Sequence, residues 1–324
     1  MKFKHAASTL LAVVSLAIFP SVQAQDNYPN KPIRLILGFG AGGGTDVITR
    51  ALAQKMTEIL GQPVVVENKA GANGNIAAEL VAKAPADGYT LLYNTSGVAI
   101  SPALYPKLSY DITRDLAPVS ITANLPIILV TANKLNADSP QDLVNKLKAN
   151  PGKLNYASAG NGNITHLSAL LFLQSTGTTA THIPYKSEAP AVTDLAGGQV
   201  DFYLGTAPGV IPLIKDGRIK GQAVSTLKRM DAMPQLPTMN ETVAPGLELG
   251  AWSGMMAPAG TKPEVIQKLN AAIAESLKDK GLLEKFASQG AEVRHSSPDQ
   301  YGAFIKAEIA RWDQIVRANK VTMD

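Results

Sequence analysis

Apolar residues follow two alternating patterns along the first third of the chain. Short runs rich in Val, Ile and Leu predict buried strands at 32–37, 63–66 and 90–93. Between them, apolar residues recur three or four positions apart and predict helices at 45–60 and 75–83. The order strand, helix, strand, helix, strand favours a parallel sheet with helices packed on its faces.

A second unit repeats this order further along the chain. Its predicted strands are 154–157, 182–185, 200–204 and 221–225, and its predicted helices are 140–149, 163–174, 189–195 and 210–215. A segment rich in β-branched residues at 117–130 predicts a long strand pair running between the two units. A further strand at 249–257 is expected to return to the first unit. The chain therefore divides into two α/β lobes.

Three patterns predict where individual helices begin. Ser139, Thr261 and Ser297 each precede a predicted helix, with an acid or Gln three positions later. Such a pair forms a capping box, in which the first side chain accepts a hydrogen bond from an unpaired backbone N–H at the helix start. We therefore expect helices to begin directly after these three residues.

The N-terminus has the pattern of a secretory signal peptide. Lys2 and Lys4 precede an apolar run at 10–19, and the short residues of 21–24 offer a cleavage site after Ala24. The apolar run has about ten residues, fewer than the roughly 20 that span a bilayer. We expect residues 1–24 to be removed and the mature protein to be exported to the periplasm.

Composition narrows the classes of protein that remain. A length of 324 residues suggests about two domains, and 45% hydrophobic with 17% charged residues is typical of a globular chain. The net charge is +4 and no run is rich in Lys or Arg, which gives no reason to expect nucleic-acid binding. The absence of Cys excludes disulfides and thiolate metal sites, and the four His form no metal-spaced pair. We expect no metal and no cofactor.

Two glycine-rich turns carry the functional signal, at 38–43 and 157–163. Each follows a predicted strand and opens a predicted helix. A helix start presents unpaired N–H groups and the positive end of the helix dipole, so two facing turns suit one small anion held between the lobes. A simpler interpretation is that both turns need Gly only for their backbone conformation.

The first turn also supports a different function. Residues 38–43 match the G-x-G-x-x-G pattern, and Glu67 follows 24 residues later, near where a ribose-binding acid would lie. This alternative is a dinucleotide-dependent oxidoreductase. The predicted export and the lack of a catalytic His/Asp or Lys/Tyr pair argue against it.

Several ordered motifs together resemble one protein family. They are PIRLI at 32–36, GGGTD at 42–46, QPVVVEN at 62–68, PADGYTLL at 85–92, NTSG at 94–97, YASAGNG at 156–162, IPYK at 183–186, DLAGGQVD at 194–201 and APAGT at 257–261. In these motifs the chain resembles the Bug-type receptors, which are periplasmic solute-binding proteins of tripartite tricarboxylate transporters. The resemblance covers the whole chain after residue 24.

The resemblance implies a type II periplasmic binding fold of class α/β, with two lobes that are each a mainly parallel sheet flanked by helices. Lobe 1 would comprise 25–122 with 250–324, and lobe 2 would comprise 123–249. It further implies a binding protein rather than an enzyme, a small carboxylate ligand held between the lobes, and membrane transporter subunits as partners. We expect a monomer.

The resemblance also implies which residues hold the ligand. In lobe 1 these residues are Phe39, Gly40, Ala41, Gly42, Gly43 and Ser96. In lobe 2 they are Ser158, Ala159, Gly160, Asn161 and Gly162. The distal half of the pocket would involve Glu188, Gly205 and Thr206. Members of the family usually have glycine in place of Glu188 and often an acid in place of Gly205.

Two interpretations of Glu188 remain open. In the first it is a solvent-exposed acid at a helix start, where it opposes the helix dipole. In the second it faces the ligand, accepts hydrogen bonds from an amine, amide or hydroxyl, and repels a second ligand carboxylate.

Overall fold

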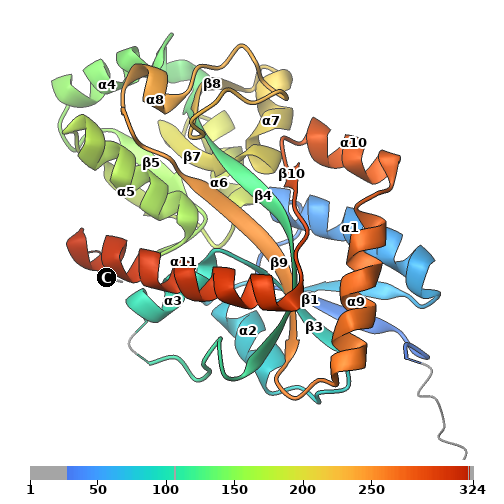
Figure 1. Ribbon diagram of the computed structural model, residues 1–324. Coiled ribbons are helices and arrows are strands. Elements are labelled where there is room, and N and C mark those ends of the chain that lie inside the picture. Colours follow the sequence, from blue (N-terminus) through green and yellow to red (C-terminus); the bar gives the residue numbers. More distant parts are fainter. Residues whose placement is uncertain (1–27, 106, 320, 322–324) are drawn as a thin grey trace, which may run out of the picture.

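The first lobe is built on three parallel strands. The computed structural model describes residues 28–105, 107–319 and 321 (Figure 1). In it β1 (Ile33–Leu37) pairs with β2 (Val64–Asn68) on one side and with β3 (Thr90–Thr95) on the other. Helix α1 (Gly44–Leu60) packs against α9 (Pro263–Ser276), and α3 (Gly97–Leu104) packs against α11 (Pro298–Ala318). The remaining elements of this lobe are η1 (Ala72–Gly74), α2 (Asn75–Ala82), α10 (Lys280–Ser288) and β10 (Glu292–Val293).

The second lobe repeats this arrangement. Its central strand β5 (Asn155–Ser158) lies parallel to and between β6 (Thr181–Pro184) and β7 (Phe202–Thr206). The other elements are η2 (Asn133–Leu135), α4 (Pro140–Ala149), α5 (Ile164–Thr176), α6 (Glu188–Ala196), α7 (Ala207–Lys215), β8 (Ile219–Val224) and α8 (Met239–Thr242). Each parallel strand of both lobes lies within three residues of its predicted position, because local apolar patterning determines these strands.

Two antiparallel strands, β4 and β9, run between the lobes (Figure 1). Strand β4 (Leu116–Ala132) pairs with β9 (Gly250–Pro258) along its first part and with β7 and β8 along its second part. The predicted strand pair within 117–130 is therefore wrong, since this segment is one continuous strand. Pro126 does not interrupt it because the pairing with β9 ends there, opposite Gly250, and the pairing with β8 begins at Ile128, so a missing N–H is tolerated at this change of partner.

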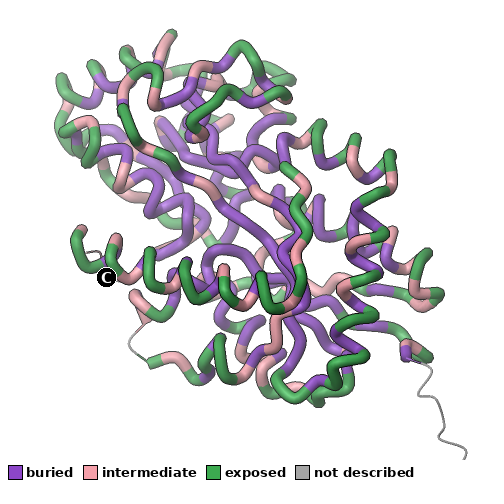
Figure 2. The backbone as a smooth tube through the Cα atoms, in the orientation of Figure 1, coloured by how far each residue is buried: buried purple, intermediate pink, exposed green. Residues whose placement is uncertain are grey.

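The buried residues follow these strands through both lobes (Figure 2). Where β3, β4 and β9 meet, the hydroxyl of Tyr93 hydrogen-bonds the hydroxyls of Thr122 at 2.8 Å and Ser253 at 2.9 Å. All three side chains are buried, so they satisfy one another's polar groups away from water. The region that joins the lobes is therefore well packed.

Two of the three predicted helix starts are confirmed. The Ser139 hydroxyl accepts from the Asp142 N–H at 3.1 Å, and Ser297 forms a capping box with Gln300. The prediction for Thr261 is wrong, because α9 begins one residue later, at Pro263, and the Thr261 hydroxyl donates to the Pro258 carbonyl instead. Proline is favoured as the first helical residue, which moves the start of α9 beyond Thr261.

The predicted signal peptide at 1–24 lies outside the described residues. Among residues 28–105, 107–319 and 321, no helix combines the length and the apolar character needed to cross a membrane.

Candidate functional site

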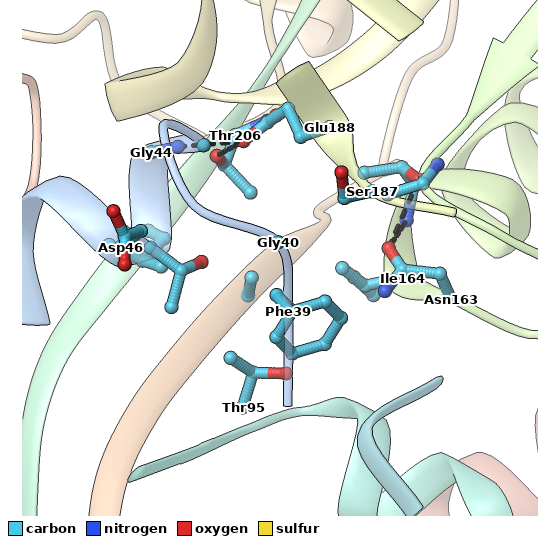
Figure 3. Close-up of a pocket in the computed structure, with 16 residues that line it drawn as sticks. Phe39, Gly40, Gly44, Asp46, Thr95, Asn163, Ile164, Ser187, Glu188 and Thr206 are labelled. Carbon is cyan, nitrogen blue, oxygen red and sulfur yellow. Dashed lines mark hydrogen bonds between the residues drawn. The ribbon is translucent and has the colours of Figure 1, made fainter. Parts of the chain in front are cut away.

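A small cavity lies between the lobes at the carboxyl ends of the parallel strands (Figure 3). Its volume is about 30 Å³, enough for about two water molecules. Its walls come from both lobes and from the crossing strands: Phe39, Gly40, Gly43, Gly44, Thr45, Asp46, Thr95, Leu125, Ala159, Asn163, Ile164, Thr165, Ser187, Glu188, Thr206 and Ala251. This position is where open α/β sheets bind ligands.

The lobe 1 wall is the turn between β1 and α1, held in place by Asp46 and Asn68. The Asp46 carboxylate accepts hydrogen bonds from the Gly42 N–H at 3.0 Å, from Arg50 at 3.0 Å and from the Asn68 amide at 2.9 Å. The same Asn68 amide donates to the Phe39 carbonyl at 2.9 Å. Burial raises the pKa of Asp46, but the hydrogen bonds from Arg50, Asn68 and Gly42 outweigh it and lower the pKa. Asp46 therefore carries a negative charge that fixes the turn.

The lobe 2 wall is the turn between β5 and α5. The Asn163 side chain caps α5 by accepting from the Thr165 N–H at 3.0 Å, and the Thr165 hydroxyl accepts from the Ala159 N–H at 2.8 Å. Gly160 and Gly162 have φ values of 127° and 69°, in the left-handed region that favours glycine. Several N–H groups of this turn are thus satisfied within the turn itself.

Two stacked histidines support that turn from behind. The rings of His166 and His182 lie 4.0 Å apart and nearly parallel. The Gly162 N–H donates to Nδ1 of His166 at 3.1 Å, and the Ser158 hydroxyl lies 2.6 Å from Nε2 of His182. Burial lowers the pKa of His166 to about 3, with a further contribution from His182, and burial lowers the pKa of His182 to about 4. Both rings are therefore neutral at pH 7.

The lobes contact each other directly through Asn73. Its amide donates to the Gly162 carbonyl at 3.1 Å, and its side-chain oxygen accepts from the Asn163 amide at 3.0 Å. Asn73 belongs to lobe 1, in η1, while Gly162 and Asn163 belong to the lobe 2 turn. Residues some 90 positions apart in sequence thus join the two walls of the cavity.

Glu188 makes a second contact between the lobes. It is the first residue of α6 and is 8% exposed, so the interpretation as a solvent-exposed helix-start acid is wrong. Its carboxylate accepts from the Thr206 N–H and hydroxyl, from the Tyr203 hydroxyl and, across the lobes, from the Gly44 N–H. Burial raises the pKa of the Glu188 carboxyl above its ordinary value, against the opposing effect of these hydrogen bonds.

The structure brings some of the predicted site residues together and leaves others outside the cavity. Phe39, Gly40, Gly43, Ala159, Glu188 and Thr206 line it. Ala41 and Gly42 are exposed on the same turn. Ser158, Gly160, Asn161 and Gly162 belong to the lobe 2 turn but do not line the cavity.

Two predicted positions face elsewhere. The Ser96 hydroxyl accepts from the Trp252 N–H at 3.1 Å, and the preceding residue, Thr95, lines the cavity instead. A Cβ atom added to Gly205 would lie 2.4 Å from the Tyr203 ring and 2.5 Å from Val210, so no larger residue fits there without rearrangement. Neither residue lines the cavity. Gly205 precedes the lining residue Thr206 in β7, and successive residues of a strand face opposite sides, so position 205 faces the packed interior.

Sequence reasoning missed several residues of the site. Asn68 and Asn73 order the two turns through contacts with distant segments, which no local pattern reveals. Asn163 was placed at the end of the second glycine-rich turn and at a helix start but not among the ligand-binding residues, yet it lines the cavity and contacts Asn73 across the lobes. The signal that could have found it is its place as the last residue of the second glycine-rich turn, at the start of α5.

Two α/β lobes joined by two crossing strands, with a cavity between them, define a periplasmic binding protein fold. The chain matches the family model described as "Tripartite tricarboxylate transporter family receptor" over residues 48–321. It is also 41% identical over 314 residues to Protein BugT of Bordetella pertussis, covering 95% of this chain and 96% of that protein. The chain therefore belongs to the tripartite tricarboxylate transporter receptor family, and the predicted family, fold class and receptor function are confirmed.

Solved structures agree with this family. The periplasmic binding protein BugD is 34% identical with a TM-score of 0.88, and the match covers 92% of this chain and all of that one. A protein of R. palustris solved with adipate is 35% identical with a TM-score of 0.88, covering 91% and 99% of the two chains. MatC of Rhodopseudomonas palustris, solved with bound malate, is 30% identical with a TM-score of 0.85, covering 89% and 100%.

The oxidoreductase alternative is wrong, since the family is one of binding receptors and not of enzymes. The structure also argues against a ribose-binding role for Glu67, the candidate acid. Its carboxylate forms a bidentate ion pair with Arg34 of the neighbouring strand, at 2.7 and 2.9 Å, and does not line the cavity.

Proposed function

We propose that this receptor binds a small carboxylate in the cavity between its lobes and delivers it to membrane transporter subunits. The observation that carries the proposal is the facing pair of turns at the β1–α1 and β5–α5 junctions, which line a common cavity from the two lobes. Two structural relatives were solved with adipate and with malate, which are both small carboxylates.

The proposal requires the lobes to separate during binding. Sites for small molecules typically have volumes of about 300–1,000 Å³. The cavity described here, at about 30 Å³, is an order of magnitude smaller. We therefore propose that lobe 1 (25–122 and 250–324) and lobe 2 (123–249) move about β4 and β9, which act as the hinge.

The remaining parts of the proposal concern export and assembly. Residues 1–24 would direct the chain to the periplasm and be removed there. The mature receptor would act as a monomer that meets its transporter subunits only transiently.

Thermal unfolding of the mature protein, followed across a library of carboxylates, tests the proposal. A ligand at 100 times its Kd should raise the free energy of unfolding by about 2.7 kcal/mol. The library should include straight-chain mono-, di- and tricarboxylates, amino acids and aromatic acids, with matched amides as uncharged controls. A shift with one or more acids and none with the amides is expected. No shift with any acid would contradict the proposal.

A further inference from the structure

The carboxylate of Glu188 is surrounded by hydrogen-bond donors. Its Oε1 accepts from the Thr206 N–H at 2.9 Å and the Tyr203 hydroxyl at 3.2 Å. Its Oε2 accepts from the Thr206 hydroxyl at 2.8 Å and the Gly44 N–H at 3.3 Å. A carboxylate has about four lone-pair positions, so these four bonds use its whole accepting capacity.

The donors themselves form an anion site. The Gly44 N–H belongs to the first turn of α1 and the Thr206 N–H lies directly before α7, where the helix dipole favours negative charge. All four donors are neutral groups. Gly209 leaves the space that the carboxylate fills, because a Cβ atom added to Gly209 would lie 2.2 Å from the Glu188 carboxyl carbon.

This anion site opens onto the proposed ligand cavity. Glu188, Thr206 and Gly44 all line that cavity, and Figure 3 shows the Glu188 and Thr206 side chains meeting Gly44 at one end of it. Asn163 and Phe39 lie toward the other end of the same view. A bound molecule with two carboxylates would therefore find the donors at the Glu188 end already occupied.

We infer that Glu188 is a built-in substitute for the second carboxylate of a ligand, so that this receptor selects monocarboxylates over dicarboxylates. The inference rests on the proposed function, in which one ligand carboxylate binds between the lobes. A second one would be desolvated next to the Glu188 carboxyl, whose four donors are already occupied, and such a loss is costly in a buried site. The four saturated acceptor positions also argue against Glu188 as the partner of a ligand amine.

Calorimetric titration with matched acids tests the selectivity. Wild type and Glu188→Ala are titrated with butyrate and valerate and with succinate, glutarate and adipate. Wild type should bind the best monocarboxylate at least tenfold more tightly than the best dicarboxylate. Glu188→Ala should gain at least tenfold in affinity for a dicarboxylate, because its second carboxylate can take the donors of Thr206, Tyr203 and Gly44. An unchanged preference in Glu188→Ala would overturn the inference.

Formate provides a second readout that does not depend on the ligand. In Glu188→Ala the vacated donors should bind formate, so that formate raises the unfolding temperature relative to the same concentration of chloride. Wild type should show no such difference. Asp194→Ala is the matched control, since Asp194 lies in the same helix α6 but accepts from Tyr185. If Glu188→Ala fails to fold alone, refolding it in formate and in chloride gives the same comparison, and equal recovery would overturn the inference.

The outcomes separate the inference from the proposed function. Wild type that binds no acid of the carboxylate library would contradict the proposed function, whereas formate rescue of Glu188→Ala would still support the donor site. Wild type that binds monocarboxylates, combined with a Glu188→Ala variant that gains neither dicarboxylate affinity nor formate stabilisation, would overturn the inference alone.

Discussion

The Glu188 carboxylate accepts a hydrogen bond from the N–H of Gly44, a residue 144 positions earlier in the chain, at 3.3 Å. This bond joins the start of α6 in one lobe to the start of α1 in the other. Glu188 also lines the cavity between the lobes. The contact between the lobes and the chemistry of the cavity therefore depend on the same side chain.

Asn73 should control how readily the lobes separate. Asn73→Gly keeps the left-handed backbone, since Asn73 has φ of 55°, but removes the bonds to Gly162 and Asn163. Two neutral hydrogen bonds contribute about 2 kcal/mol, so the population with separated lobes should rise about thirtyfold. Small-angle scattering without added carboxylate should show a larger radius of gyration for the variant.

Asn136→Gly is the matched control for that measurement. Asn136 also has a left-handed backbone, with φ of 51°, but it is exposed and lies at the end of η2, away from the cavity. Its replacement should leave the radius unchanged. Equal radii for wild type and both variants would mean that Asn73 does not hold the lobes together.

Acid should lower the free energy of unfolding through the buried histidines. The pKa of His166 is lowered to about 3, whereas an unfolded chain has an ordinary value near 6.5. Below pH 6.5 the imidazole of the unfolded state binds a proton, whereas His166 in the folded state stays neutral until the pH approaches 3. The free energy of unfolding therefore decreases as the pH falls from 7. At pH 5 the loss from His166 should be about 2 kcal/mol.

Urea unfolding at pH 7 and pH 5 checks this sign and size. His166→Asn keeps an acceptor for the Gly162 N–H but does not titrate in this range. The variant should therefore lose less stability than wild type between the two pH values. Identical losses in the two proteins would show that His166 is not the titrating group.

Glycine at position 205 should be required for packing. Gly205→Ala places a Cβ atom within 2.5 Å of both Tyr203 and Val210, and overpacking of this kind typically costs about 1–3 kcal/mol. Gly250→Ala in β9 is the control, because no atom lies within 4 Å of the added Cβ. Urea unfolding should show a clear loss for the first variant and a change below about 0.5 kcal/mol for the second. Similar effects in both would contradict the packing argument.

Local patterns were enough to predict most strands and helices, because each depends on residues near one another in sequence. The Ser139 and Ser297 helix starts were predictable for the same reason. Helix α3 was missed, since Gly97–Leu104 is almost uniformly buried and shows no apolar stripe. Helix α10 (Lys280–Ser288) was also missed, because its nine residues give too short a periodic pattern.

The site was only partly predictable because its contacts join distant segments. The glycine-rich turns marked where two walls of the cavity would form. The burial of Glu188 and the role of Asn73 follow instead from how the lobes pack, which residues near 73 or 188 do not encode. The step from Gly205 to Thr206 in β7 shows a further limit, since one position along a strand reverses the direction of the side chain.

A reversible cross-link between the lobes tests most directly whether the ligand binds in the cavity. A Cβ atom added to Gly40 would lie 3.2 Å from Cβ of Ser187, slightly under the usual spacing of about 3.8 Å in a disulfide. The chain contains no other cysteine, so Gly40→Cys with Ser187→Cys can form only this intramolecular bond.

Calorimetric titration of the oxidised and reduced double variant with the best acid from the carboxylate screen gives the answer. The two single-cysteine variants, treated identically, control for each substitution. The oxidised protein should bind no carboxylate, because the cross-link prevents the cavity of about 30 Å³ from expanding. The reduced protein should bind the carboxylate again. Equal affinities before and after reduction would place the carboxylate site outside the cavity and contradict the account.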